Sequence, residues 1–156
     1  MVGAGRIRVV TADPDAQALA AQRRVSTIAD TTGELNSALQ RARSQLEQDG
    51  FQNGSLMVLP IDLPFATNSS LSEADKQPAD IVVAPDEGGT GTNLLLLRSG
   101  AWNFPFRFGP NSYARHLSQA QSSGLTLVSL ADWRLARDID SPDQYMAWMR
   151  ASAPNT

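Results

Sequence analysis

Apolar residues along the chain form short continuous runs, separated by segments in which apolar residues recur at helical spacing. The continuous runs are rich in Val, Ile and Leu, which is typical of strands buried on both faces. They predict strands over residues 7–11, 25–29, 56–61, 81–85, 93–98 and 125–130.

The amphipathic segments predict helices between these strands. In the clearest case, Leu35, Ala38, Ala42 and Leu46 share one face of a helix over residues 34–48. Asp13 before Pro14 predicts a capped helix start. Further helices are expected over residues 70–76, 112–121 and 142–150, the last capped by Ser141.

Strands that alternate with helices predict an α/β sandwich with a mostly parallel central sheet. No repeat or linker interrupts the pattern, so we expect a single domain over residues 1–150, followed by a flexible tail over residues 151–156. In such sheets ligands bind beyond the carboxyl ends of the strands.

The amino-acid composition argues against several classes of protein. The 156 residues carry 13 basic and 16 acidic side chains, which argues against a nucleic-acid-binding protein. With no cysteine, thiolate catalysis, disulfides and cysteine-bound zinc are excluded. The longest aliphatic run, residues 94–97, is too short to cross a membrane, and residues 1–8 do not resemble a signal peptide. We therefore expect a cytoplasmic protein.

Three carboxylates follow predicted strands or precede a helix. Asp62 comes just after the strand over residues 56–61, and Asp138 and Asp140 precede the last helix. Magnesium prefers one or two carboxylates together with phosphate oxygens and water. A magnesium site is one interpretation, and turn or capping residues are the competing one.

The glycine-rich segment over residues 86–93 connects two predicted strands. Its backbone could form an anion-binding nest, with Thr90, Thr92 and Asn93 as further donors. A flexible connection explains the composition as well, and no Lys-Ser/Thr pair follows the glycines as a Walker loop requires.

Residues 108–116 combine a tight turn with a helix start. Gly109 and Pro110 form the turn, and the helix beginning at Ser112 would present free N–H groups to an anion. Arg115 could bind a phosphate, although a solvated surface charge is the alternative. His116 is the single histidine and is expected to be structural.

Asn36 lies at the start of another predicted helix. Its amide could pair with a base or ribose, and helix capping is the alternative.

In order along the chain, these segments resemble the motifs of one family, the 2-phospho-L-lactate or phosphoenolpyruvate guanylyltransferases of deazaflavin coenzyme F-420 biosynthesis. The most distinctive are Pro-Asp…Gly-Thr-Gly-Thr-Asn and Phe-Gly-Pro-Asn-Ser-Tyr-Ala-Arg-His. The resembling segments are residues 33–39, 59–64, 81–86, 89–93, 108–116 and 138–143.

The resemblance implies a three-layer fold of the nucleotide-diphospho-sugar transferase type (GT-A, Rossmann-like). It implies transfer of GMP from GTP to 2-phospho-L-lactate, phosphoenolpyruvate or 3-phospho-D-glycerate, with release of pyrophosphate. A homodimer is left open.

The resemblance also implies roles for individual residues. Asp62, Asp138 and Asp140 would hold Mg²⁺ and serve catalysis. The acceptor would bind at Thr92, Asn93, Gly109, Ser112 and Arg115, and Asn36 would lie on the nucleotide side.

One departure from the family concerns the start of the chain. Members usually begin with a further strand and a Lys/Arg-rich phosphate-binding loop, and Met1 falls just before their second strand, so we expect an N-terminally truncated version. The alternatives are an inactive or ligand-binding homologue and another nucleotidyl- or glycosyltransferase of the same fold. A glycosyltransferase would need a second Asp after Asp62, and Leu63-Pro64 does not supply it.

Overall fold

The computed structural model describes residues 3–152, which divide into two compact units. The first runs to Gly54 and includes Pro105–Phe108, and the second comprises Ser55–Phe104 and the chain from Gly109 onward. That residues 1–150 form one domain remains a prediction. The predicted tail over residues 151–156 begins inside the last helix, and residues 153–156 lie outside the described part of the chain.

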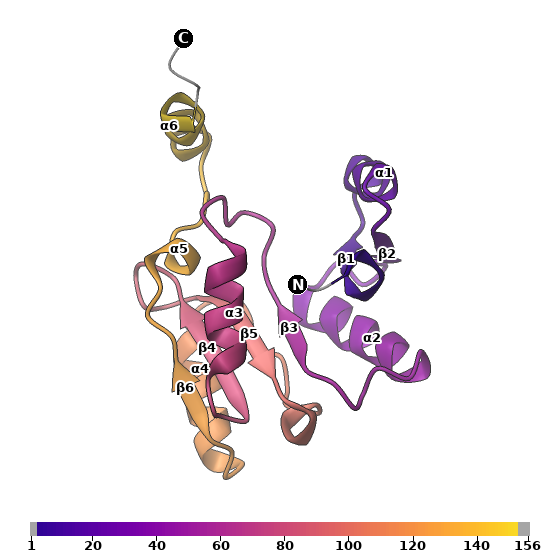
Figure 1. Ribbon diagram of the computed structural model, residues 1–156, viewed down its shortest axis with the longest axis vertical. Helices are drawn as coiled ribbons and strands as arrows, with labels where there is room; N and C mark the ends of the chain where they lie inside the picture. Colours follow the sequence, from indigo (N-terminus) through magenta and orange to yellow (C-terminus); the bar gives the residue numbers. More distant parts are fainter. Residues whose placement is uncertain (1–2, 153–156) are drawn as a thin grey trace. The chain divides into compact units, whose positions relative to one another are not determined.

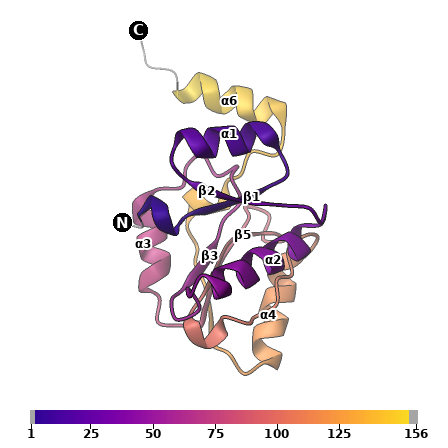
Figure 2. The same cartoon turned by 90° about the vertical axis from the view of Figure 1, so that its right-hand side faces the viewer.

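The first unit is a parallel two-stranded sheet with helices on opposite sides (Figure 2). As predicted, Asp13 caps its first helix, because its Oδ1 accepts from the backbone N–H of Asp15 at 2.7 Å. Its elements are η1 (Ala4–Arg6), β1 (Arg8–Thr11), α1 (Pro14–Gln22), β2 (Ser26–Ala29) and α2 (Leu35–Gln48).

The second unit contains a four-stranded sheet in the order β3-β5-β4-β6 (Figure 1). Its elements are β3 (Leu56–Val58), α3 (Asn68–Lys76), β4 (Ile81–Pro85), β5 (Thr92–Leu97), η2 (Ser99–Ala101), α4 (Ser112–Ser122), β6 (Leu127–Ser129), α5 (Trp133–Ala136) and α6 (Pro142–Ser152). The short helix α5 was not among the predicted elements.

The second unit's sheet is mixed because one strand is reversed. β3, β4 and β6 run in one direction, and β5 is antiparallel to both of its neighbours. The connection from β4 to β5, residues 86–91, is too short for the crossover that parallel strands need, so the chain must turn back. As a result, β5 begins at the edge of the sheet where β4 ends.

The core of the second unit lies on both faces of β4 and β5, whose apolar side chains are almost all fully buried. One face packs against α3 through Ala74 and against α5 through Leu135. α4 lies on the opposite face, and its buried residues include His116 and Ala120. Each buried Leu or Val contributes roughly 1.5–3 kcal/mol through the hydrophobic effect, which makes this the stable frame of the unit.

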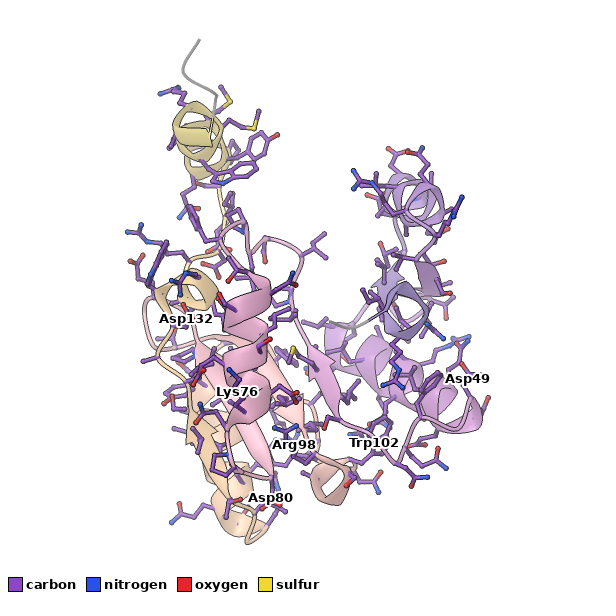
Figure 3. The ribbon with its side chains drawn as sticks, viewed as in Figure 1. Asp49, Lys76, Asp80, Arg98, Trp102 and Asp132 are labelled. Atoms are coloured by element: carbon purple, nitrogen blue, oxygen red, sulfur yellow. The ribbon has the colours of Figure 1, made fainter. Side chains whose placement is uncertain are left out.

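At the edge where β4 begins, polar groups are bonded to one another. The guanidinium of Arg98, which is labelled in Figure 3, bonds to the carboxylate of Asp75 at 2.6 Å and to the Ser55 hydroxyl at 3.2 Å. Asp80 accepts from the backbone N–H of Thr126 at 2.9 Å and from its hydroxyl at 2.6 Å. These bonds join the ends of strands and helices, so this edge has a structural role.

None of the helices within residues 3–152 is both long enough and apolar enough to cross a bilayer.

Candidate active site

A β-bulge at the start of β5 determines which way its first side chains point. The pairing of β4 with β5 shifts between Ala84, which faces Leu94, and Pro85, which faces Thr92, and Asn93 is the extra residue. Asn93 and Leu94 therefore both contact the α5 side, and Thr92 turns to the α4 side. The two neighbours Thr92 and Asn93 thus serve opposite faces of the sheet.

On the α4 side, three buried polar side chains form a hydrogen-bonded group. The hydroxyl of Ser112 donates to Thr92 Oγ1 at 3.2 Å, and Thr92 Oγ1 lies 3.0 Å from His116 Nδ1. All three side chains are at most 6% exposed. Two predicted acceptor-binding residues, Thr92 and Ser112, are therefore in direct contact.

The turn before α4 carries two further predicted acceptor residues. Gly109 has φ +105°, a conformation that favours glycine, and Arg115 Nη2 lies 3.4 Å from the position that a Cβ would take there. Arg115 is exposed and donates to Pro110 O. The backbone N–H of Ser112 donates to Gly109 O at 3.0 Å, so an anion at this turn would share or replace that bond.

On the α5 side, Asn93 contacts one of the predicted metal ligands. Its side-chain N–H groups reach Ala136 O and Asp138 Oδ2, both at 3.3 Å. Nearby, the backbone N–H of Ile139 donates to Asp62 O at 3.0 Å. The segments that carry Asp62 and Asp138 therefore lie side by side, although they are far apart in sequence.

The carboxylates of this group repel one another. The pKa of Asp140 is raised above its ordinary value, first by the negative charge of Asp138, then by partial desolvation, and then by Asp62 and Asp86. Asp62 Oδ1 is buried and has no hydrogen-bond partner. Among the described residues, no three acidic or His side chains are close enough to hold a metal ion by themselves. An ion here would therefore need other oxygen ligands as well.

The glycine-rich loop over residues 86–91 binds the carboxylate of one of its own residues, Asp86. The Asp86 carboxylate accepts from the backbone N–H of Thr90 at 2.7 Å and from its hydroxyl at 3.1 Å. A Cβ at Gly91 would lie 2.8 Å from Asp86 Oδ2, so the side chain occupies the inside of the turn. The backbone N–H and the hydroxyl of Thr90, two of the donors expected to bind an anion, are thus bonded within the loop.

Asn36 belongs to the first unit, where it bonds to the backbone of Phe108. Its Nδ2 donates to Phe108 O at 3.1 Å, and its Oδ1 accepts from Phe108 N–H at 2.8 Å. The capping residue of α2 is Glu34, whose carboxylate accepts from Asn36 N and Ser37 N. A nucleotide contact of Asn36 remains a prediction.

Two residues gained significance only in the structure: His116 contacts Thr92, and Asp86 fills the glycine-rich loop. Asn93, predicted as an acceptor residue, bonds instead to Asp138 on the other face of the sheet. The Asp-Glu-Gly-Gly-Thr pattern of residues 86–90 is itself a signal for a carboxylate that caps a tight turn, and it could have indicated the role of Asp86.

Comparison with known proteins agrees with the resemblance seen in the sequence. The chain is 38% identical over 152 residues to the phosphoenolpyruvate guanylyltransferase of Chloroflexus aggregans, covering 96% of this chain and 73% of that protein. It is 29% identical over 109 residues to the 2-phospho-L-lactate guanylyltransferase of Methanosphaera stadtmanae, covering 70% of this chain and 46% of that protein. The chain therefore spans only part of the length of these relatives.

The fold also has solved counterparts. A crystal structure from Desulfovibrio desulfuricans G20, described as a nucleotide-diphospho-sugar transferase, matches with a TM-score of 0.69 at 18% identity. The match covers 96% of this chain and 67% of that one, and it confirms the predicted fold type. A family model described as "Guanylyl transferase CofC like" matches residues 3–149, nearly all of the chain. The chain belongs to this guanylyltransferase family.

Proposed function

We propose that this protein transfers GMP from GTP to the phosphate of a small three-carbon phospho-acid and releases pyrophosphate. Family membership supports guanylyl transfer. The observation that carries the proposal is the bulge at Asn93. Because of it, the Thr92 hydroxyl lies on one face of the sheet, where it is available to the acceptor, and Asn93 contacts the carboxylate of Asp138 on the other face.

Phosphoenolpyruvate is the acceptor that we place first. The relative at 38% identity has that acceptor in its name, and the relative named for 2-phospho-L-lactate is 29% identical. 2-Phospho-L-lactate and 3-phospho-D-glycerate are the other candidates. We assign the product to deazaflavin coenzyme F-420 biosynthesis in the cytoplasm. Dimer formation stays a prediction.

The acceptor is proposed to bind on the α4 side through its carboxylate. Thr92 supplies a hydroxyl there, and the turn at Gly109 with the start of α4 at Ser112 supplies backbone N–H groups. Arg115, next to Gly109, supplies a positive charge for a phosphate. These groups fit a small anion that carries both a carboxylate and a phosphate.

Mg²⁺ is proposed to bind on the other face. The residues present fit it, because Asp62 Oδ1 is a buried oxygen without a partner and Asp140 lies in the field of neighbouring carboxylates. One or two carboxylates completed by phosphate and water is the arrangement that magnesium prefers. Asp62, with Asp138 or Asp140, would hold the ion, which would neutralise the charge of the triphosphate.

The reaction needs no nucleophilic side chain. An oxygen of the acceptor's phosphate attacks the α-phosphorus of GTP, the new P–O bond forms, and the bond to the β-phosphate oxygen breaks as pyrophosphate leaves. Positioning of the two substrates in line, together with charge neutralisation, supplies most of the rate enhancement in such transfers. The protein's contribution is therefore to position the acceptor and the metal ion. Asn93 contributes by holding Asp138, one of the proposed metal ligands, in place.

The test is pyrophosphate release from GTP with Mg²⁺ and each of the three acceptors in turn. We expect release with one acceptor, none without an acceptor, and a loss of at least about a hundredfold in Asp62→Asn. Absence of release with all three acceptors contradicts the proposal. If calorimetry then shows binding of an acceptor but not of GTP, the chain is a ligand-binding homologue.

A further inference from the structure

His116 is an unusual residue to find completely enclosed. Its side chain is 0% exposed, and its ring lies 6.1 Å from the ring of Phe104, measured between centroids. Burying an imidazole costs free energy unless its nitrogens are hydrogen-bonded. The Nδ1 atom has such a bond, at 3.0 Å to Thr92 Oγ1.

The protons in this group can be counted. Ser112 gives its hydroxyl proton to Thr92 Oγ1, so Ser112 has none left for a ligand. Thr92 has one proton of its own. If Thr92 gives that proton to His116 Nδ1, neither hydroxyl can donate to a bound anion. If Nδ1 carries a proton and donates to Thr92, the hydroxyl proton of Thr92 is free to point at the anion.

We propose that His116 is a positioning residue for the acceptor. Its Nδ1–H donates to Thr92 Oγ1 and thereby directs the Thr92 hydroxyl proton toward the acceptor's carboxylate. This inference rests on the proposed function, because it takes the ligand at Thr92 to be an anion. In this proposal His116 does not contact the substrate. It acts by preventing Thr92 from donating its hydroxyl proton to the imidazole.

Three substitutions separate this role from simple packing. Asparagine can place an amide N–H where the imidazole Nδ1 lies, glutamine reaches the Nε2 position, and leucine fills the space without a donor. His116→Leu is expected to raise the KM for phosphoenolpyruvate at least about tenfold, because a bond to a charged group loses its oriented donor. The KM for GTP should change by less than about twofold. His116→Asn should stay within about threefold of the wild-type KM for phosphoenolpyruvate, and His116→Gln should resemble His116→Leu.

A double-mutant cycle tests the route through Thr92. In a Thr92→Val background the hydroxyl is absent, so His116→Leu should have little further effect on the KM for phosphoenolpyruvate. Additive effects, an equal change in both KM values, or a His116→Asn variant as impaired as His116→Leu would each overturn the proposal.

A spectroscopic test needs no turnover. Because His116 is the chain's single histidine, ¹⁵N-labelled histidine gives the NMR signals of this one ring. We expect Nδ1 to show the shift and one-bond coupling of a protonated nitrogen. An unprotonated Nδ1 overturns the inference whatever the activity. If the wild-type protein releases no pyrophosphate with any acceptor while Nδ1 is protonated, the proposed function fails and the orientation of Thr92 stands.

Discussion

At the scale of single residues, Asp140 shows that the carboxylates of the site repel one another in the folded protein. Its side chain is exposed, yet its pKa is raised, chiefly by the charge of Asp138. Like charges held near one another destabilise the folded protein, and they persist at binding sites because a cation or substrate relieves them. The backbone bond between Ile139 and Asp62 keeps the acidic segments together without the ion.

Asp140→Asn is therefore expected to raise the melting temperature at neutral pH while lowering guanylyl transfer. A folded-state pKa above the unfolded value means that the carboxyl favours folding while it is protonated, and that this contribution is lost as the pH rises through the folded pKa. The difference in stability between variant and wild type should thus grow as the pH rises through the folded pKa and then level off. We expect this difference in unfolding free energy to stay below about 1 kcal/mol, because the Asp140 side chain is exposed to solvent.

Thermal melts of both proteins from pH 3 to pH 8 measure this difference. Asp143→Asn removes a charge from the exposed first turn of α6 and serves as the control. An Asp140→Asn variant that is less stable than wild type at pH 7 would contradict the assigned cause.

At the scale of elements, the loop over residues 86–91 decides how β5 begins. The Asp86 carboxylate lies against Gly91 and bonds to Thr90. This arrangement closes the turn directly before the bulge that separates Thr92 from Asn93. A change inside the loop should therefore affect the site on both faces of the sheet.

Gly91→Ala is expected to destabilise the protein by about 1–3 kcal/mol, because the new Cβ would lie 2.8 Å from Asp86 Oδ2 and displace it. Gly88→Ala is the matched control, since its nearest neighbour would lie at 3.8 Å and the substitution should change stability by less than about 0.5 kcal/mol. Urea denaturation measures both. Equal effects of the two substitutions would show that Asp86 does not occupy the turn in solution.

A second prediction at this scale concerns the joint between β4 and β6. Asp80 bonds to the backbone and hydroxyl of Thr126, and these bonds lower its pKa, with the hydroxyl bond as the largest cause. A lowered pKa gives stability that is present above the unfolded value and lost as the pH falls through the folded value.

Asp80→Asn should therefore reduce the urea midpoint at pH 7, and its difference from wild type should shrink as the pH falls below about 4. In a Thr126→Val background, which lacks the hydroxyl, the same substitution should have a smaller effect. A difference that is independent of pH would show that the charge of Asp80 plays no part.

At the scale of the whole molecule, metal and nucleotide should stabilise the protein together. Among the described residues, the carboxylates around Asp62 form no group of three that could hold an ion by themselves, so in the proposed site we expect the phosphates of GTP to supply further ligands. Mg²⁺ or GTP alone should change the melting temperature little. Mg²⁺ and GTP together, each at about a hundred times its dissociation constant, should raise the melting temperature by roughly 5–10 °C.

Thermal shift measurements with Mg²⁺, GTP and the pair test this cooperation. Asp62→Asn should abolish the joint effect, and Asp143→Asn should leave it intact. Strictly additive shifts of Mg²⁺ and GTP would show that the two ligands bind at separate places.

Much of this molecule follows from local sequence. Apart from the short helix α5, apolar runs and helical spacing predict the strands and α-helices to within a few residues, because these periods reflect backbone geometry. The caps at Asp13 and Ser141 are equally local, since each side chain bonds to N–H groups two or three residues away. The motifs of residues 86–93 and 108–116 sufficed to indicate the family.

Tertiary structure alone decided which side chains meet. The reversal of β5 and the bulge at Asn93 depend on pairing with β4, and they send Thr92 and Asn93 to opposite faces. No local pattern shows that Asn36 binds Phe108, or that His116 is buried against Thr92, because these partners are 72 and 24 residues apart. Sequence thus determines which groups are available, and strand pairing determines where each one points.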